Sequence, residues 1–116
     1  MGGPDRSRVI RLADARMRIP GPAGEHSASV LRRGTVNVKL SLPVHPNVQT
    51  PHEQDEIYLI VAGRDVLVHD GQRDRCQAGD LAFVAAGSEH HFEDFTDDLV
   101  VWVVFFGPQG GEVVAD

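Results

Sequence analysis

Two stretches decide the fold of this chain, TPHEQDEIYLIVAG at residues 50–63 and GDLAFVAAGSEHHFED at residues 79–94. The first carries an imidazole, His52, and a carboxylate, Glu56, which opens an apolar run. The second carries another imidazole, His90, just after a glycine-containing turn. Two histidines and one carboxylate form the donor set of a known class of divalent-metal site. The sequence therefore presents these three side chains as candidate metal ligands.

The spacing of His52 and Glu56 requires a bend in the chain. On a straight strand these residues would lie about 13 Å apart, whereas each donor must come within about 2.0–2.2 Å of one ion. The intervening residues 53–55 are polar and poor strand formers, so they suit such a bend. We therefore expect a bend that leads directly into a strand.

A helix that begins at Thr50 is the alternative. Thr50 and Glu53 form a capping-box pattern, and Pro51 fits the first helical position. Against a helix, Ile57–Val61 is an unbroken apolar run rich in β-branched and aromatic residues, and Gly63 closes it. Such a run, followed by an alternating segment, is typical of a strand, a turn and a second strand. We favour the strand.

Segments of strand character follow one another through most of the chain. Thr35–Leu42 alternates apolar and polar side chains, which predicts a half-buried strand. Asp70-Gly71 is a strong hairpin signal, and Leu99–Phe106 is apolar throughout, as in a strand that is buried on both faces. Short strands at this spacing, with almost no helical periodicity, predict an all-β barrel or sandwich.

The two stretches resemble the two sequence motifs of the cupin superfamily. The matching positions are Thr50, His52, Glu56 and Gly63 in the first motif, and Gly79, Ala85, Gly87, His90 and Asp94 in the second. More narrowly, the chain resembles a group of small bacterial single-domain cupins. The resemblance implies a small double-stranded β-helix, the cupin jelly-roll barrel, open at one end. It also implies that His52, Glu56 and His90 bind a divalent metal ion, Fe, Mn, Ni or Zn.

Three positions depart from the cupin pattern. Thr50 stands where many cupins have their first histidine, Ala85 where they have proline, and Asp94 where they have asparagine. The fourth metal ligand is therefore absent, which implies a more open coordination sphere or a site that has lost its metal. His45, in the loop before His52, is an alternative fourth ligand, although a loop histidine between prolines is more often exposed.

Strand alternation predicts which other side chains enter the barrel. If Glu56 points inward, so does Tyr58; if His90 points inward, so does Phe92, while His91 points outward. The Tyr58 hydroxyl is a candidate catalytic group, because it can donate a hydrogen bond or a proton to a bound ligand. The alternative is a core aromatic with a satisfied hydroxyl. The predicted substrate-lining residues are Gln54, Tyr58, Phe92 and Trp102. For Phe92 and Trp102 the alternative is packing in the core, which is more typical of such side chains than ligand contact.

The chain divides into an N-terminal arm at residues 1–29, a barrel at residues 30–107 and a loose tail at residues 108–116. Val9–Ile19 mixes arginines with apolar residues, which is consistent with a short edge strand or a turn. This segment and Leu99–Phe106 carry more apolar surface than one small barrel covers. We therefore expect a homodimer, which the resemblance also implies.

Composition limits the classes of function. A chain of 116 residues with 41% hydrophobic residues is one domain with a core of its own. A formal net charge of −6 argues against nucleic-acid binding. The sequence has neither an apolar run of membrane-spanning length nor a signal-peptide pattern, and Cys76 is its only cysteine. We expect a soluble, cytoplasmic protein with no membrane partner and no internal disulfide.

Two functions from different classes follow from this reading. The first is a metal-dependent enzyme of the dioxygenase, isomerase or hydrolase type, acting on a small organic acid, a keto compound or a sugar derivative. The second is a non-catalytic module that binds or senses a small molecule or a metal. The fold does not choose between them, because one scaffold supports many activities.

Overall fold

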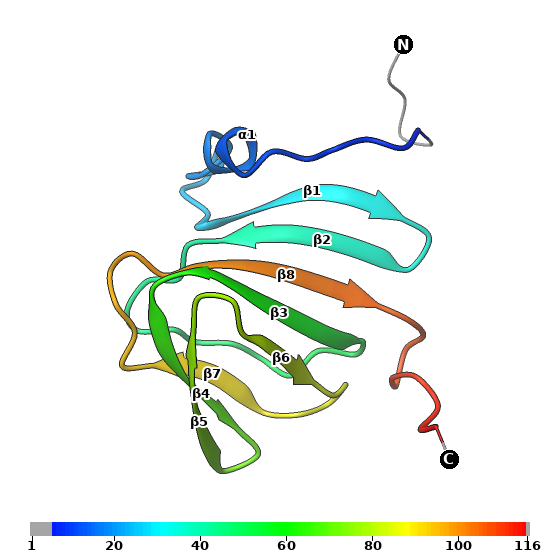
Figure 1. The fold of residues 1–116 in the computed structure, drawn as a ribbon. Helices are drawn as coiled ribbons and strands as arrows, with labels where there is room; N and C mark the ends of the chain where they lie inside the picture. The colour runs from blue at the N-terminus through cyan, green and yellow to red at the C-terminus, as the bar shows by residue number, and fades with distance from the viewer. Residues whose placement is uncertain (1–5, 116) are drawn as a thin grey trace.

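The structure is a computed structural model and describes residues 6–115. The described part contains one helix and eight strands: α1 (Leu12–Arg16), β1 (Ser27–Arg33), β2 (Val36–Ser41), β3 (Asp55–Ala62), β4 (Arg64–His69), β5 (Gln72–Gln77), β6 (Leu81–Val84), β7 (His90–Glu93) and β8 (Val100–Phe106). The strands form a five-stranded sheet, β1-β2-β8-β3-β6, and a three-stranded sheet, β5-β4-β7. Figure 1 shows these sheets as the two walls of the molecule. The all-β jelly-roll prediction is confirmed.

The main core lies between the two sheets. Ile60 and Val101 contribute from the larger sheet, and Leu67 and Phe92 contribute from the smaller one. The prediction of a strand buried on both faces is correct for β8. Its inward side chains join this main core, whereas Trp102 and its neighbour Val100 belong to a second cluster on the outer face of the sheet.

The second cluster forms because α1 packs on the outer face of the larger sheet. Ala15 of α1 and Leu40 of β2 are both almost fully buried there, and Leu12 and Ile19 pack against them. The short edge strand or turn that we expected within residues 9–19 is therefore wrong for α1. Leu12, Ala15 and Ile19 recur at helical spacing, a signal that the interspersed arginines obscured.

The edge strand of this region is β1, which among the described strands pairs only with β2. It begins at Ser27, so it crosses the predicted boundary between arm and barrel at residue 30. Figure 1 shows α1 beside this edge of the five-stranded sheet. The division into arm, barrel and tail otherwise stays a prediction.

Two turns confirm their sequence signals. Asp70 and Gly71 both have positive φ, 49° and 80°, as the type I′ turn of a two-residue hairpin requires. Gly63 has a φ of 82°, and a Cβ there would lie 2.8 Å from the Cα of Leu99. Only glycine therefore lets the β3–β4 turn pack against the chain that leads into β8.

A buried carboxyl group lies just after this turn. Asp65 of β4 is 3% exposed, and neither of its side-chain oxygens has a hydrogen-bond partner among residues 6–115. Burial raises the pKa of Asp65 to about 6, and the negative charge of Asp80 adds to the effect. The folded state therefore holds this proton more tightly than the unfolded chain does.

Asp65 makes the free energy of unfolding depend on pH. Because its pKa is higher in the folded state, about 6 against 3.8, the stability associated with its protonated form is lost as the pH rises through 6. Denaturant unfolding at pH 5 and pH 8 should show a smaller loss in Asp65→Asn than in the wild type. Equal losses in the two proteins would contradict the assignment.

Candidate metal centre and its cavity

The structure brings the three predicted ligands together. His52 lies in the loop before β3, Glu56 is the second residue of β3, and His90 is the first residue of β7. Glu56 Oε1 lies 3.2 Å from His90 Nε2 and 3.9 Å from His52 Nε2. One donor atom from each residue lies within 4.8 Å of the other two. This arrangement is compact enough to hold one ion.

The predicted bend is present, and no helix forms at Thr50. Residues 53 and 54 form a bend, and β3 begins at Asp55. The backbone carbonyl of His52 accepts a hydrogen bond from the amide of Gly87, at 2.8 Å. The turn of the second sequence motif is thereby fastened directly to the bend of the first.

Asp55 strengthens this connection. Its buried carboxylate accepts a hydrogen bond from the Ala86 amide at 3.0 Å and another from the Glu112 amide at 2.8 Å. Both hydrogen bonds lower the pKa of Asp55, and the one from the Glu112 amide has the larger effect. The sequence assigned this residue to the bend and residues 108–116 to a loose tail. The tail is instead attached to the bend as far as residue 112. In addition to the hydrogen bond from Glu112, the Gly110 amide donates to the Glu53 carbonyl at 2.7 Å.

The contact between Glu56 and His90 is the main electrostatic feature of the centre. His90 Nδ1 lies 2.9 Å from the Ser88 carbonyl and donates to it, so Nε2 carries the free lone pair. That lone pair faces a carboxylate oxygen, and neither atom has a hydrogen-bond partner among the described residues. Buried polar atoms are normally paired, so two facing acceptors require a cation or a proton between them. The donor set therefore fits a divalent metal ion.

The pKa shifts of the two histidines have opposite signs. Burial lowers the pKa of His52, and the positive charges of His90 and Lys39 add to this effect against the attraction of Glu56. For His90, burial also acts to lower the pKa, but the Glu56 carboxylate and the Ser88 carbonyl outweigh it and raise the pKa. A proton and a metal ion therefore compete for the same place, between Glu56 and His90.

An inner cavity of about 140 Å³ opens at the cluster. Its lining consists of Ser27, Lys39, Ser41, Asn47, Gln49, His52, Glu56, Tyr58, Phe92, Val103 and Phe105. The structure thus places Tyr58 and Phe92 beside the metal-ligand candidates, with the inward orientation that strand alternation predicted. Lining residues of β1 and β2 in the same sheet, such as Lys39, were not identified from the sequence.

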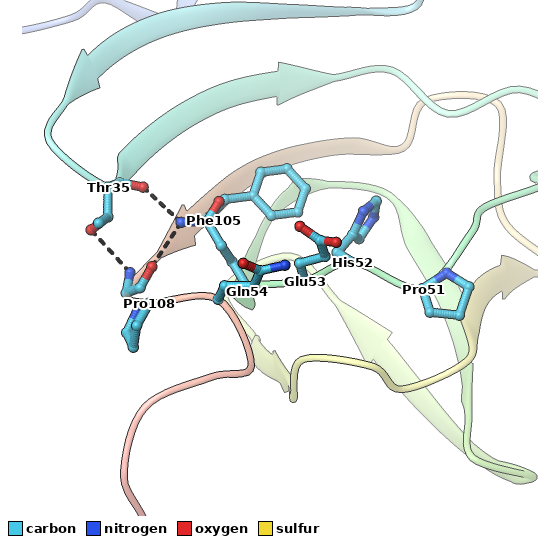
Figure 2. Close-up of a pocket in the computed structure, with 9 residues that line it drawn as sticks. Thr35, Pro51, His52, Glu53, Gln54, Phe105 and Pro108 are labelled. Atoms are coloured by element: carbon cyan, nitrogen blue, oxygen red, sulfur yellow. Dashed lines mark hydrogen bonds between the residues drawn. The ribbon is translucent and has the colours of Figure 1, made fainter.

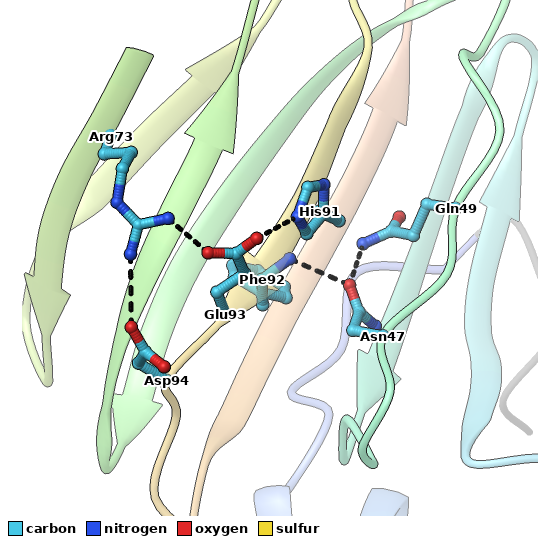
Figure 3. Close-up of polar contacts among 7 residues, drawn as sticks. All are labelled: Asn47, Gln49, Arg73, His91, Phe92, Glu93 and Asp94. Carbon is cyan, nitrogen blue, oxygen red and sulfur yellow. Dashed lines mark hydrogen bonds and ion pairs between the residues drawn. The ribbon is translucent and has the colours of Figure 1, made fainter. Parts of the chain in front are cut away.

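Tyr58 takes part in a hydrogen-bond chain that fixes the loop before β3. Its hydroxyl donates to Gln49 Oε1 at 3.3 Å, and the Gln49 amide donates to Asn47 Oδ1 at 2.9 Å. Asn47 Oδ1 also accepts from the Phe92 amide at 2.9 Å, as Figure 3 shows. Burial, followed by the charge of Glu56, raises the pKa of Tyr58. The tyrosine therefore remains a protonated hydrogen-bond donor.

Gln54 lies in an outer vestibule and not in the inner cavity. Its amide donates to the Thr35 carbonyl at 2.9 Å and to the Gly107 carbonyl at 3.0 Å, which connects the β1–β2 turn to the end of β8. Figure 2 shows Gln54 reaching toward Thr35, with His52 and Phe105 nearby. The vestibule has a volume of about 610 Å³, and His52 and Phe105 line both spaces. The rings of His52 and Phe105 therefore lie at the boundary between the vestibule and the inner cavity.

Other candidates lie away from the cavity. Trp102, predicted to line it, packs in the second cluster because its side chain leaves the opposite face of β8 from Val103. The alternative ligand His45 stacks on Phe95 with ring centroids 3.7 Å apart. Thr50 is exposed and belongs neither to the donor cluster nor to the cavity lining.

His91 points outward, as strand alternation predicted. Its Nε2 lies 2.8 Å from Glu93 Oε1, and Glu93 also pairs with Arg73 of β5. Arg73 reaches Asp94 as well, at 3.1 Å. Figure 3 shows this charged network across the outer face of the smaller sheet. The two adjacent histidines therefore have separate environments.

The fold and the cluster together define a class, a small jelly-roll barrel with a candidate metal centre in its cavity. A family model described as the cupin domain matches residues 42–106. The chain belongs to the cupin family, as its two motifs predicted. The described residues include no helix long and apolar enough to span a bilayer.

Comparisons with individual proteins agree with this assignment. An uncharacterized protein of Streptomyces coelicolor is 38% identical over 61 residues, which cover 53% of this chain and 58% of that protein. The chain thus matches less than two thirds of the length of this curated relative. A Cupin 2 conserved barrel domain protein from Salinispora arenicola has a TM-score of 0.62 at 21% identity, covering 88% of this chain and 91% of that one.

A third comparison concerns a protein whose activity is predicted. The crystal structure of a predicted oxalate decarboxylase from Thermotoga maritima has a TM-score of 0.54 at 25% identity. The match covers 68% of this chain and 76% of that one.

The adjacent histidines provide a matched pair of variants for metal binding. His90→Ala removes a donor of the buried cluster, so the affinity for Mn²⁺ or Zn²⁺ should fall at least about 100-fold. Removal of a group that merely orients a metal ligand already lowers metal affinity by up to about 100-fold. His91→Ala should retain wild-type affinity, because His91 faces away. Competitive metal titration with elemental measurement of bound metal checks both. Equal affinities in the two variants would contradict the assignment.

Proposed function

We propose that this protein is a metal-dependent enzyme that acts on a small organic acid. The observation that carries the proposal is the pair of facing acceptors, Glu56 Oε1 and His90 Nε2, buried without hydrogen-bond partners beside His52. A divalent ion supplies Lewis acidity when bound, and three protein ligands leave positions for substrate, water or dioxygen. Iron, manganese, nickel and zinc are the candidate metals.

The side chains around the cluster have distinct proposed roles. His90 is oriented by the Ser88 carbonyl, so its free nitrogen stays directed at the centre. Phe92 and Val103 cover the inner side of the cavity and exclude water. Tyr58 keeps its proton and offers it as a hydrogen bond to a ligand that displaces Gln49 as acceptor. We therefore propose Tyr58 as a catalytic group that acts as a donor and not as a base.

Two observations favour an acid as the substrate. A positive side chain, Lys39, lines the inner cavity. In addition, one similar structure is that of a predicted oxalate decarboxylase, whose substrate class is a small carboxylate. We propose a reaction of the dioxygenase, decarboxylase, isomerase or hydrolase type, in which His52, Glu56 and His90 would hold the metal and the metal would supply Lewis acidity toward the acid.

A non-catalytic module that binds a small molecule or a metal is the second candidate. The exposure of Thr50 favours it, because the position of the fourth ligand in many cupins contributes nothing to this cavity. A centre with three protein ligands can then serve to hold a ligand and not to transform it. Turnover distinguishes the two candidates.

Turnover is measured on protein loaded anaerobically with Fe²⁺, Mn²⁺, Ni²⁺ or Zn²⁺. Each form is incubated with two- to four-carbon acids while oxygen uptake and product formation are followed. Glu56→Gln should lower kcat/KM at least about 100-fold, because the carboxylate of the candidate donor set is lost. Glu53→Gln, an exposed neighbour in the same bend, should stay within about twofold. Tight binding of metal and acid by the wild type without turnover would refute the enzyme and support the binding module.

We also propose that the protein forms a homodimer. The sequence predicted pairing from the apolar surfaces of Val9–Ile19 and β8. Within the chain these two surfaces partly cover each other, because α1 and Trp102 belong to the same hydrophobic cluster. Another apolar surface remains on β3 and on the edge strand β6. There Leu81 is 61% exposed and Phe83 is 54% exposed, and Leu81 pairs in register with the partly exposed Leu59. A second copy covers such a surface and the free edge of β6 through a two-fold contact.

The dimer has a direct test in solution. Phe83→Glu should convert a dimer into a monomer in sedimentation velocity, because it places a charge in the centre of the apolar surface. Arg75→Glu, on an exposed position of β5 in the other sheet, is the control and should leave the wild-type mass unchanged. A monomeric wild type, or a dimeric Phe83→Glu, would show that this surface is not the contact.

A further inference from the structure

The inner face of the β1–β2 hairpin is polar. Ser27 pairs in register with Ser41, and both line the cavity together with Lys39. The apolar residues of the same hairpin, including Val30 and Leu40, face the opposite way and pack under α1. The cavity is therefore lined by apolar side chains, such as Phe92 and Val103, and by one hydrophilic wall that the β1–β2 hairpin forms. Such a wall contributes little to packing, so its polar groups are available to a ligand.

Lys39 is the charged residue of this wall. Its backbone pairs with β1 and β8, but its side-chain ammonium makes no ion pair and no hydrogen bond with any residue in the described range 6–115. It is partly buried, and its place in the sheet register is opposite Val103, which is in turn opposite Tyr58. With strands about 4.8 Å apart, the backbones of Lys39 and Tyr58 are about 10 Å apart across the cavity wall. An ammonium group thus faces the space beside the metal-ligand candidates.

The size of the cavity limits what this ammonium group can bind. The cavity holds about 140 Å³, and a cavity of about 150 Å³ accommodates benzene, with its six non-hydrogen atoms. A hexose has about twice as many and does not fit. A two- or three-carbon acid does fit. Of the substrate classes that the sequence left open, the sugar derivative is therefore disfavoured for the inner cavity.

Charge points to the same class of ligand. A divalent ion, the Glu56 carboxylate, Lys39 and two neutral imidazoles together carry a net charge of about +2. A partly buried charge without a counter-charge is costly. An anion that contacts both the metal and Lys39 removes this cost, whereas a neutral ligand of the same shape does not. Serine hydroxyls on the wall can donate to the remaining carboxylate oxygen.

We infer that Lys39, supported by Ser27 and Ser41, is the carboxylate-binding subsite of the cavity, and that the ligand is a two- or three-carbon acid. Its carboxylate pairs with the Lys39 ammonium while a second oxygen atom faces the cluster of His52, Glu56 and His90. This inference rests on the proposed function and adds to it the class of substrate and the residue that selects it.

The test compares charged and neutral ligands of the same shape. Oxalate and its neutral diamide, oxamide, are titrated into Mn²⁺-loaded wild type, Lys39→Met and Lys39→Arg by calorimetry, with pyruvate and pyruvamide as a second pair. The wild type should bind one acid at least tenfold more tightly than its amide. Lys39→Met should lose about tenfold or more of the affinity for that acid, as expected for a lost charge-assisted hydrogen bond, while Lys39→Arg should retain the preference for the acid.

A control variant separates a local effect from the general charge of the protein. Arg32→Met removes one positive charge from an exposed position of β1, and its affinity for the acids should match that of the wild type. Unchanged acid binding by Lys39→Met, or no preference of the wild type for either acid over its amide, would overturn the inference.

Metal content and the effect of Lys39 are measured separately, so the two proposals can fail separately. Lys39→Met should bind Mn²⁺ with the stoichiometry of the wild type. If the wild type binds no metal, the proposed metal-dependent enzyme is refuted. The same acids are then tested on the metal-free protein by measuring the midpoint temperature of thermal unfolding. A rise in this midpoint with oxalate or pyruvate that is absent in Lys39→Met still supports the subsite, and its absence in the wild type overturns it.

A second measurement needs no variant. Lys39 is the only lysine in the chain, so reductive methylation followed by peptide mass spectrometry reports on one side-chain amine. Oxalate or pyruvate should slow the methylation of Lys39 several-fold, and the matching amide should not. Equal protection by the acid and the amide, or no protection by either, would contradict a carboxylate bound at this residue.

Discussion

The contact between Glu56 and His90 is the constraint on which the rest of the site depends. Because His90 donates from Nδ1 to the Ser88 carbonyl, its other nitrogen presents a lone pair to a buried carboxylate oxygen at 3.2 Å. Two acceptors at this distance repel unless a positive species lies between them. A fold that keeps such a pair buried therefore has a place for a cation at this point, and the third candidate ligand, His52, faces the same place.

The backbone around this contact is held by hydrogen bonds between segments that are distant in sequence. The bend before β3 and the turn before β7 meet where the Gly87 amide donates to His52, and the Asp55 carboxylate joins the same turn to the C-terminal segment. These contacts position His52 and Glu56 relative to His90 without using the ligand atoms themselves. The donor atoms are thereby left free for a metal.

Much of the fold and the metal-ligand cluster could be predicted from the sequence. The alternation around Glu56 and His90 correctly placed Tyr58 and Phe92 inside the barrel and His91 outside, because the side-chain period of a strand is local. The prediction that Trp102 lines the cavity was wrong, because a strand buried on both faces has no polar side to show which face meets the cavity. The helix α1 was missed because five residues give a short periodic signal.

The sequence by itself determined the class of fold, the two motifs and the parity of each strand, because these depend on side-chain chemistry and spacing over a few residues. Only the tertiary structure decided that the polar face of β2, and not its apolar face, lines the cavity. That choice depends on α1, which covers the apolar face from a distant part of the chain. Lys39 faces the cavity for this reason, since burying Leu40 under the helix turns its neighbour inward.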